Sequence, residues 1–131
     1  MHNNKIRQCL AGCSLLALLA VTQVQAAACV PASVEKGSQL FAQECSVCHT
    51  VQKDVKGMMG VNLHGVAGRT SGTFPGFSYS QAMKDKAVPW KTENLQAFIT
   101  QPQAFVPGTY MPYMGMAAAD SAAVACFLSQ Q

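Results

Sequence analysis

The chain of 131 residues has few charges, no long apolar run and little that suggests a β-strand. Charged residues make up only 11% of it, and no run of like charges suggests a nucleic-acid or polybasic membrane surface. The apolar stretch Leu10–Val21 is shorter than the about 20 residues that a membrane-spanning helix needs. After residue 29 we find neither a useful strand-like alternation nor an internal repeat. These shortages leave a small all-α domain as the expected fold class.

The first 28 residues have the pattern of a secretory signal peptide. Lys5 and Arg7 lie in a short polar start, an apolar stretch follows, and small residues at 26–28 suit a signal peptidase. We expect cleavage at 26–28, a mature domain of residues 29–131 and a periplasmic protein. Loss of the two cations reduces the net charge from +3 to +1, so the basic character of the whole chain is mostly a targeting effect.

The segment Cys45-Ser46-Val47-Cys48-His49 is a C-x-x-C-H motif, the attachment signature of a c-type haem. Because residues three and four apart share a helix face, both thiols can bond one porphyrin edge while His49 turns to the iron. Zinc would need a second Cys or His pair, and no other close C-x-x-C or H-x-x-x-H occurs. A thioredoxin-like pair would follow a strand, yet these residues have helical periodicity. The motif therefore predicts covalent haem c, iron ligation by His49, and electron transfer.

Two further cysteines, Cys29 and Cys126, belong to the expected mature chain. In an oxidising compartment a disulfide between them would close a loop of about 97 residues and stabilise the fold. Two alternatives stay open. In the first, Cys29, which follows three alanines, is a lipidated first residue of the mature chain. In the second, both thiols are free.

Four segments have helical patterns. Ser33 can cap a helix to about Cys48, with an apolar side that includes Gly37 and Phe41, and Ser78 or Ser80 can open a short helix through Lys86. Thr92 is an N-cap candidate for a helix that ends before Pro102, with Leu95, Phe98 and Ile99 on one face. The last helix, about 117–129, has Val124, Phe127 and Leu128 on one stripe and Cys126 off it, facing outward.

Two long irregular stretches, 57–77 and 102–115, separate these helices. Long loops in a small domain usually wrap around something, and a haem would supply both that object and apolar surface. We therefore expect the haem-free chain to be largely unfolded.

The second iron ligand is sought among seven methionines. Met111 ends the segment Pro107-Gly108-Thr109-Tyr110-Met111, which closely resembles the P-G-T-K-M loop of mitochondrial-type class I cytochromes c, in which the methionine binds iron. The others are expected to be core filler or loop residues.

The resemblance to class I cytochromes c extends along nearly the whole expected mature chain. The matching segments, in family order, are Val34-Glu35-Lys36-Gly37 with Phe41, the motif from Cys45 to Val51, Val61-Asn62-Leu63-His64-Gly65 with Gly68-Arg69, Phe77-Ser78-Tyr79-Ser80 with Trp90, and 124–128. It implies three main helices, shorter ones, and long loops wrapped around a covalently attached haem. It also implies that Arg69, Tyr79 and Trp90 hold one haem propionate, that Thr109 lies near the other, and that His64 is no ligand.

Some positions depart from the family pattern. Val61 replaces a proline whose carbonyl orients the proximal histidine, which any residue's carbonyl can do. Phe98 and Met83 replace polar residues on the methionine side, so we expect a reduction potential at least as high as the family's. Gln103, Ala104 and Tyr110 replace lysines around the haem edge.

The function implied by the resemblance is a periplasmic one-electron carrier that is not an enzyme. It would be a monomer that exchanges electrons with redox proteins, such as membrane respiratory complexes, and binds no nucleic acid. The alternatives are a gas sensor or peroxide-reactive haem protein with an open sixth site, and a dedicated haem subunit of an oxidoreductase complex.

Overall fold

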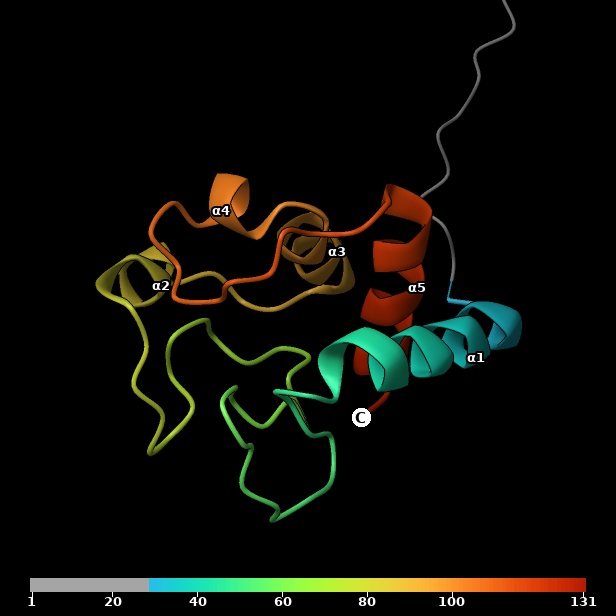
Figure 1. The fold of residues 1–131 in the computed structure, drawn as a ribbon, viewed down its shortest axis with the longest axis horizontal. Helices are drawn as coiled ribbons and strands as arrows, with labels where there is room; N and C mark the ends of the chain where they lie inside the picture. The colour runs from blue at the N-terminus through green and yellow to red at the C-terminus, as the bar shows by residue number, and fades with distance from the viewer. Residues whose placement is uncertain (1–28) are drawn as a thin grey trace, which may run out of the picture.

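The structure, a computed structural model, describes residues 29–131, and within this range helices are joined by long irregular segments (Figure 1). Its elements are α1 (Pro31–Leu40), the π-helical turn η1 (Phe41–Cys45), α2 (Gln81–Lys86), α3 (Thr92–Thr100), α4 (Pro102–Phe105) and α5 (Ala118–Leu128). The described range contains no β-strand, only an isolated bridge between Thr70 and Pro89. The predicted all-α class is therefore confirmed. The expected signal peptide lies outside the described residues.

The N-cap of helix α1 lies three residues earlier than the sequence predicts. Pro31 takes the first helical position, where its fixed φ suits the helix and its missing N–H leaves no donor unpaired. The N-cap is Val30, whose side chain makes no capping bond, so the predicted cap role of Ser33 is wrong. At its other end the helix widens into η1, where the Ser46 N–H donates to the Phe41 carbonyl at 2.9 Å.

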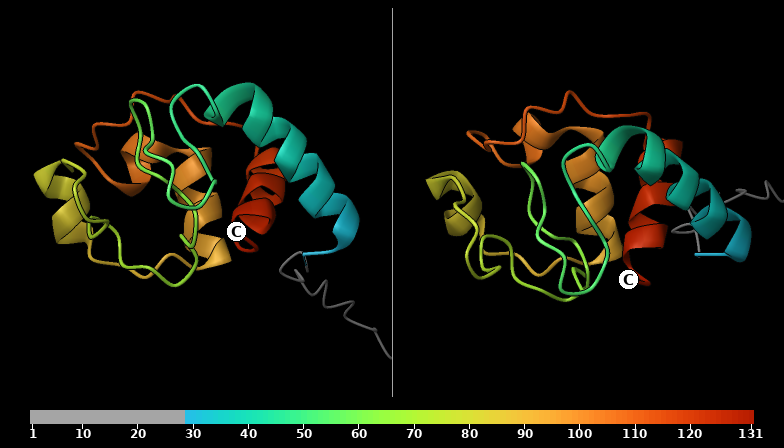
Figure 2. Two further views of the ribbon diagram at one scale, coloured as in Figure 1. Left: turned by 90° about the horizontal axis from the view of Figure 1, so that it is seen from below. Right: turned by 60° about the horizontal axis from the view of Figure 1, so that its bottom comes forward.

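Helices α1 and α5 cross at one end of the molecule and pack closely against each other (Figures 1 and 2). The crossing point is Gly37, which is buried, and a Cβ there would overlap the backbone carbonyl of Ala123. Beside it, the rings of Phe41 and Phe127 have centroids 5.4 Å apart. The glycine therefore permits the close approach of the two helices, and the aromatic contact packs beside it.

Helix α3 packs against α5 with the face that the sequence predicts. Leu95, Phe98 and Ile99 are all buried. The N-cap, however, is Lys91, so the predicted cap Thr92 is the first residue of the helix. Pro102 follows α3 as expected and begins the short helix α4, because proline fits the first turn of a helix.

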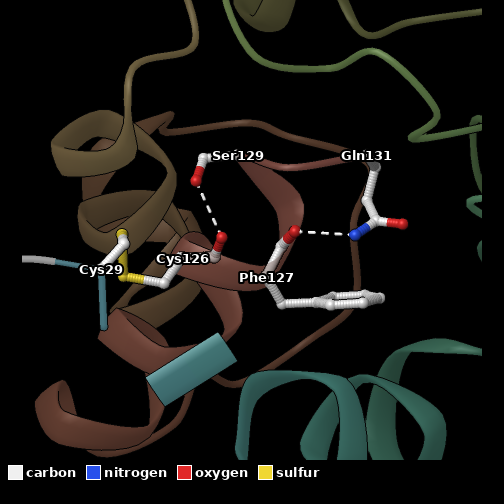
Figure 3. The surroundings of a disulfide bond; sticks show 5 residues. All are labelled: Cys29, Cys126, Phe127, Ser129 and Gln131. Carbon is white, nitrogen blue, oxygen red and sulfur yellow. Dashed lines mark hydrogen bonds between the residues drawn. A yellow bond between two sulfur atoms is a disulfide. The ribbon is translucent and has the colours of Figure 1, made fainter. Parts of the chain in front are cut away.

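Cys126 does not face outward as predicted. Its side chain is buried, and the structure joins it to Cys29 in a disulfide, with the two Cα atoms 5.2 Å apart (Figure 3). Figure 3 also shows Cys126 and Phe127 pointing from α5 in different directions, one toward Cys29 and one away from it. The predicted stripe is otherwise as expected, since Val124 and Leu128 are buried in the core.

The irregular segments 46–80 and 106–117 are held in place by specific hydrogen bonds. Ser80 caps α2, accepting a bond from the Met83 N–H at 3.2 Å, so Ser80 and not Ser78 opens that helix. Asn62, which is buried, donates to the carbonyls of Gln52 and Val55 at 2.9 and 2.5 Å. Its Oδ1 accepts from the His64 N–H at 2.7 Å. These bonds give the loops one conformation without regular secondary structure.

None of the helices in residues 29–131 combines the length and the apolar character that crossing a membrane requires.

Candidate functional site

A cavity of about 560 Å³ lies between the helices and the irregular segments. Its inner wall is apolar and is formed by two helices: Leu95, Phe98 and Ile99 come from α3, and Val124 and Leu128 come from α5. The opposite walls come from the end of η1 and from the segments around residues 59–63, 77–80 and 109–113. Apolar lining over most of a cavity this size suits a large, flat, mostly apolar group.

The C-x-x-C-H motif forms one wall of this cavity. Cys45, Cys48 and His49 all line it, and a turn after η1 is closed by the His49 N–H, which donates to the Cys45 carbonyl at 2.9 Å. The two thiols are not bonded to each other. Burial raises the pKa of the Cys45 thiol to about 11, assisted by the neighbouring Glu44. A disulfide oxidoreductase needs the opposite, a lowered thiol pKa, so the thioredoxin-like alternative does not fit.

His49 is oriented by a single backbone hydrogen bond. Its Nδ1 donates to the Val61 carbonyl oxygen at 2.7 Å. The backbone carbonyl of Val61 therefore orients the histidine, as predicted. This bond places the proton on Nδ1 and leaves Nε2 as the lone-pair nitrogen that can bind a metal. Burial lowers the pKa of His49, which favours the neutral ring that ligation requires. Gly60 lies against the ring, and a Cβ there would collide with it.

Met111 lines the same cavity from the segment after α4. The Met111 N–H donates to Thr109 Oγ1 at 3.3 Å, and the Gln103 side-chain amide donates to the carbonyls of Thr109 and Met111 at 3.1 and 3.3 Å. Gln103 therefore fixes this segment, a role that sequence reasoning missed. Met59 and Met83 also line the cavity, Met59 from an exposed position and Met83 from the core.

The four predicted propionate residues, Arg69, Tyr79, Trp90 and Thr109, all line the cavity. Arg69 also donates to the Asn62 carbonyl at 3.1 Å and to the His64 carbonyl at 3.4 Å, and its guanidinium lies 4.7 Å from the ring centroid of Phe74. Burial lowers the pKa of Arg69 and raises the pKa of Tyr79, while the charge of Arg69 opposes the latter shift. His64 is exposed and does not line the cavity.

One contact at the site could not be predicted from any local pattern. The Tyr113 hydroxyl donates to the carboxylate of Glu44, joining the segment that carries Met111 to η1 across the cavity. Burial and the contact with Glu44 both raise the pKa of Tyr113. The two residues are 69 positions apart in the chain, so only the fold brings them together.

These features define a class of protein. Two adjacent thiols, an oriented neutral histidine and a thioether sulfur surround one apolar cavity in an all-α domain, which is the donor set of a protein that holds a c-type haem. Other metal sites do not fit, since nowhere in residues 29–131 do three His, Cys, Asp or Glu side chains gather as candidate ligands.

Comparison with known proteins gives the family. Residues 34–131 match the family model described as "Cytochrome c", and the chain belongs to this family as a class I cytochrome c. It is 41% identical over 86 residues to a "Cytochrome c" of Ginkgo biloba, covering 66% of this chain and 76% of the relative. It is 45% identical over 84 residues to that of Euglena viridis, covering 64% and 81%. With "Cytochrome c 2.1" of Caenorhabditis elegans it shares 44% over 89 residues, covering 68% and 79%.

Membership of this family establishes haem c, with its iron, as the cofactor, and electron transfer with redox proteins as the general function.

Proposed function

We propose that this protein is a periplasmic one-electron carrier in which Cys45 and Cys48 attach the haem and His49 and Met111 bind its iron. The observation that carries the assignment is the bond between His49 Nδ1 and the Val61 carbonyl. It leaves Nε2 free for iron in a cavity that Met111 also lines. The haem, when bound, supplies an iron that alternates between two oxidation states.

The residues of the chain support electron transfer and do not need to act chemically on a substrate. His49 and Met111 would both hold the iron and would leave no site on it for a substrate, so we assign no catalytic residue. Phe98, Ile99 and Val124 line the inner wall and exclude water from it. Arg69, Tyr79, Trp90 and Thr109 are the polar or hydrogen-bonding groups that we assign to the propionates.

The alternative of a gas sensor or peroxide-reactive protein has less support. Such sites usually carry a hydrogen-bonding side chain on the open face of the haem. Among the described residues around the cavity, His49 is the one histidine, and Arg69 is already engaged by two backbone carbonyls. A dedicated haem subunit remains an outcome that co-purification with a large oxidoreductase would reveal.

The ferric absorption spectrum tests the ligand assignment. We expect a low-spin spectrum with a methionine-sulfur-to-iron charge-transfer band. Met111→Ala should abolish this band, because it removes the thioether sulfur that we assign to the iron. Met114→Ala is the matched control, since Met114 is 91% exposed and does not line the cavity, and it should keep the band. A high-spin ferric spectrum of the unmodified protein would overturn the assignment.

The periplasmic location and the monomeric state belong to the same proposal. They are supported by the signal-peptide pattern of residues 1–28 and by the pairing of Cys29 with Cys126, since disulfides persist in oxidising compartments. Membrane respiratory complexes are the proposed partners. Fractionation of cells that produce the full chain tests the location, and haem protein recovered from the cytoplasm would contradict it.

A further inference from the structure

The mouth of the cavity is formed by the residues that both line it and are exposed. These mouth residues are Glu44, Val47, Met59, Ser78, Tyr110 and Pro112. Four of the six are apolar or aromatic, and the largest are held well out in solvent. Tyr110 is 75% exposed, Met59 73% and Val47 60%. Beside Tyr110 and Met111 along the chain, Met114 is 91% exposed.

Positive charge is absent from this mouth. No lysine of the described residues lines the cavity. Lys53 and Lys56 line a separate hollow with His64, and Lys36 is paired with Asp120 at 2.6 Å. The Lys86 ammonium lies over the ring of Phe105, 4.3 Å from its centroid. The single charge among the mouth residues is the carboxylate of Glu44, which accepts a bond from Tyr113.

Large apolar side chains exposed around a functional opening usually mark a surface that another molecule covers. A mouth without cations offers no attraction to an acidic partner, whereas its exposed Tyr and Met side chains are of the kinds enriched in protein interfaces. The charge pattern therefore favours a partner face that is itself uncharged and apolar.

We propose that the mouth of the cavity is a docking surface for a redox protein with an uncharged, apolar face, and that this contact forms without electrostatic steering. The inference rests on the proposed electron-carrier function and adds the chemistry of its partner. Association through such surfaces depends on the apolar area covered and not on long-range attraction, so its rate changes little with salt.

Electron self-exchange between oxidised and reduced copies of the haem-loaded protein provides the test, because a second copy presents the same largely apolar mouth, which carries no cation. The rate is measured from nuclear magnetic resonance line broadening in mixtures of the two states. We expect it to change by less than about 2-fold between 0.01 M and 1 M salt, although the Debye length falls from about 30 Å to about 3 Å over this range.

Two neighbouring residues supply a matched pair of variants. Met59 and Met58 are 73% and 74% exposed, but Met59 lines the cavity and Met58 lines the separate hollow. The double variant Met59→Lys with Tyr110→Lys should exchange about 10-fold more slowly at low salt and recover as salt is added, because like charges then face each other across the contact. Met58→Lys alone should leave the rate within about 2-fold of the unmodified protein, since no charge is placed at the mouth.

Three results would overturn the proposal. They are a steep salt dependence of the unmodified protein, equal slowing by Met58→Lys, and unchanged exchange in the double variant. If the double variant instead loses only binding to vesicles of phosphatidylcholine, the mouth contacts lipid and the proposal is wrong. The ferric spectrum is recorded first, because loss of the methionine-to-iron band signals failure of the electron-carrier assignment and not of the docking surface.

Discussion

At the scale of single residues, a side chain outside the cavity wall helps to position the site. Asn62 is buried and makes three hydrogen bonds to backbone groups of Gln52, Val55 and His64, and its own carbonyl accepts from Arg69. It therefore organises the loop that contains Val61, whose carbonyl orients His49. The sequence identified this asparagine only as part of a family motif, because nothing local indicates that four partners converge on it.

Replacement of Asn62 by Ala should lower the free energy of unfolding by about 2–4 kcal/mol, because it leaves buried backbone groups unpaired. Urea unfolding of the haem-loaded protein measures this change. Asn94→Ala is the control, since its side chain makes one bond, to the Pro89 carbonyl at 2.8 Å, and should cost about 1 kcal/mol or less. Equal losses in the two variants would contradict the organising role of Asn62.

At the scale of elements, the helix pair α1 and α5 is the structural frame of the site. The sequence patterns predicted α1, α2, α3 and α5 and the buried faces of α3 and α5, but not α4, which lies in a stretch that was expected to be irregular. The predicted caps Ser33 and Thr92 are wrong, and of the two alternatives Ser78 and Ser80 the structure has Ser80. Cap prediction failed because packing and Pro31 decided where α1 begins, whereas a capping side chain contributes only about 1 kcal/mol.

Gly37→Ala should lower the free energy of unfolding by about 3 kcal/mol, because its Cβ would overlap the Ala123 carbonyl and push α1 away from α5. Gln39→Ala, on the exposed side of the same helix, should change it by less than about 0.5 kcal/mol. Denaturant unfolding of both variants measures the difference. A stable Gly37→Ala protein would mean that the helices can separate without cost.

The bond between Cys29 and Cys126 ties the start of α1 to α5. Because the two cysteines are 97 positions apart, loss of the bond should lower the free energy of unfolding by about 4 kcal/mol, mainly through the freedom that the unfolded chain gains. Unfolding of the Cys29→Ala, Cys126→Ala double variant measures this. Intact mass before and after reduction gives a separate check, because two alkylatable thiols in the untreated mature protein would show that the pair is not bonded.

At the scale of the whole molecule, the hydrophobic core is incomplete without its cofactor. Buried residues such as Leu95, Phe98 and Val124 face a cavity of about 560 Å³ and would face water if nothing filled it. A compact haem-free chain would either keep an empty cavity or collapse around it. In both cases these side chains would lose the packing contacts that the cofactor provides.

We therefore expect the haem-free protein to be largely unfolded. Far-ultraviolet circular dichroism of the Cys45→Ala, Cys48→Ala variant, which cannot attach haem covalently, measures the helix content. The disulfide would remain intact in this variant, so it separates the contribution of haem from that of the cross-link. A native-like spectrum without haem would contradict the expectation.

The sequence by itself determined the haem motif, the all-α class and the buried faces of α3 and α5, because these depend on spacing within a few residues. The tertiary structure decided what depends on residues distant in the chain. It gathered Cys45, His49 and Met111 around one cavity, covered Cys126, joined Tyr113 to Glu44 and left an apolar mouth without lysines. The physical reason is that local patterns record helix faces, whereas contacts across the cavity arise only when several segments pack together.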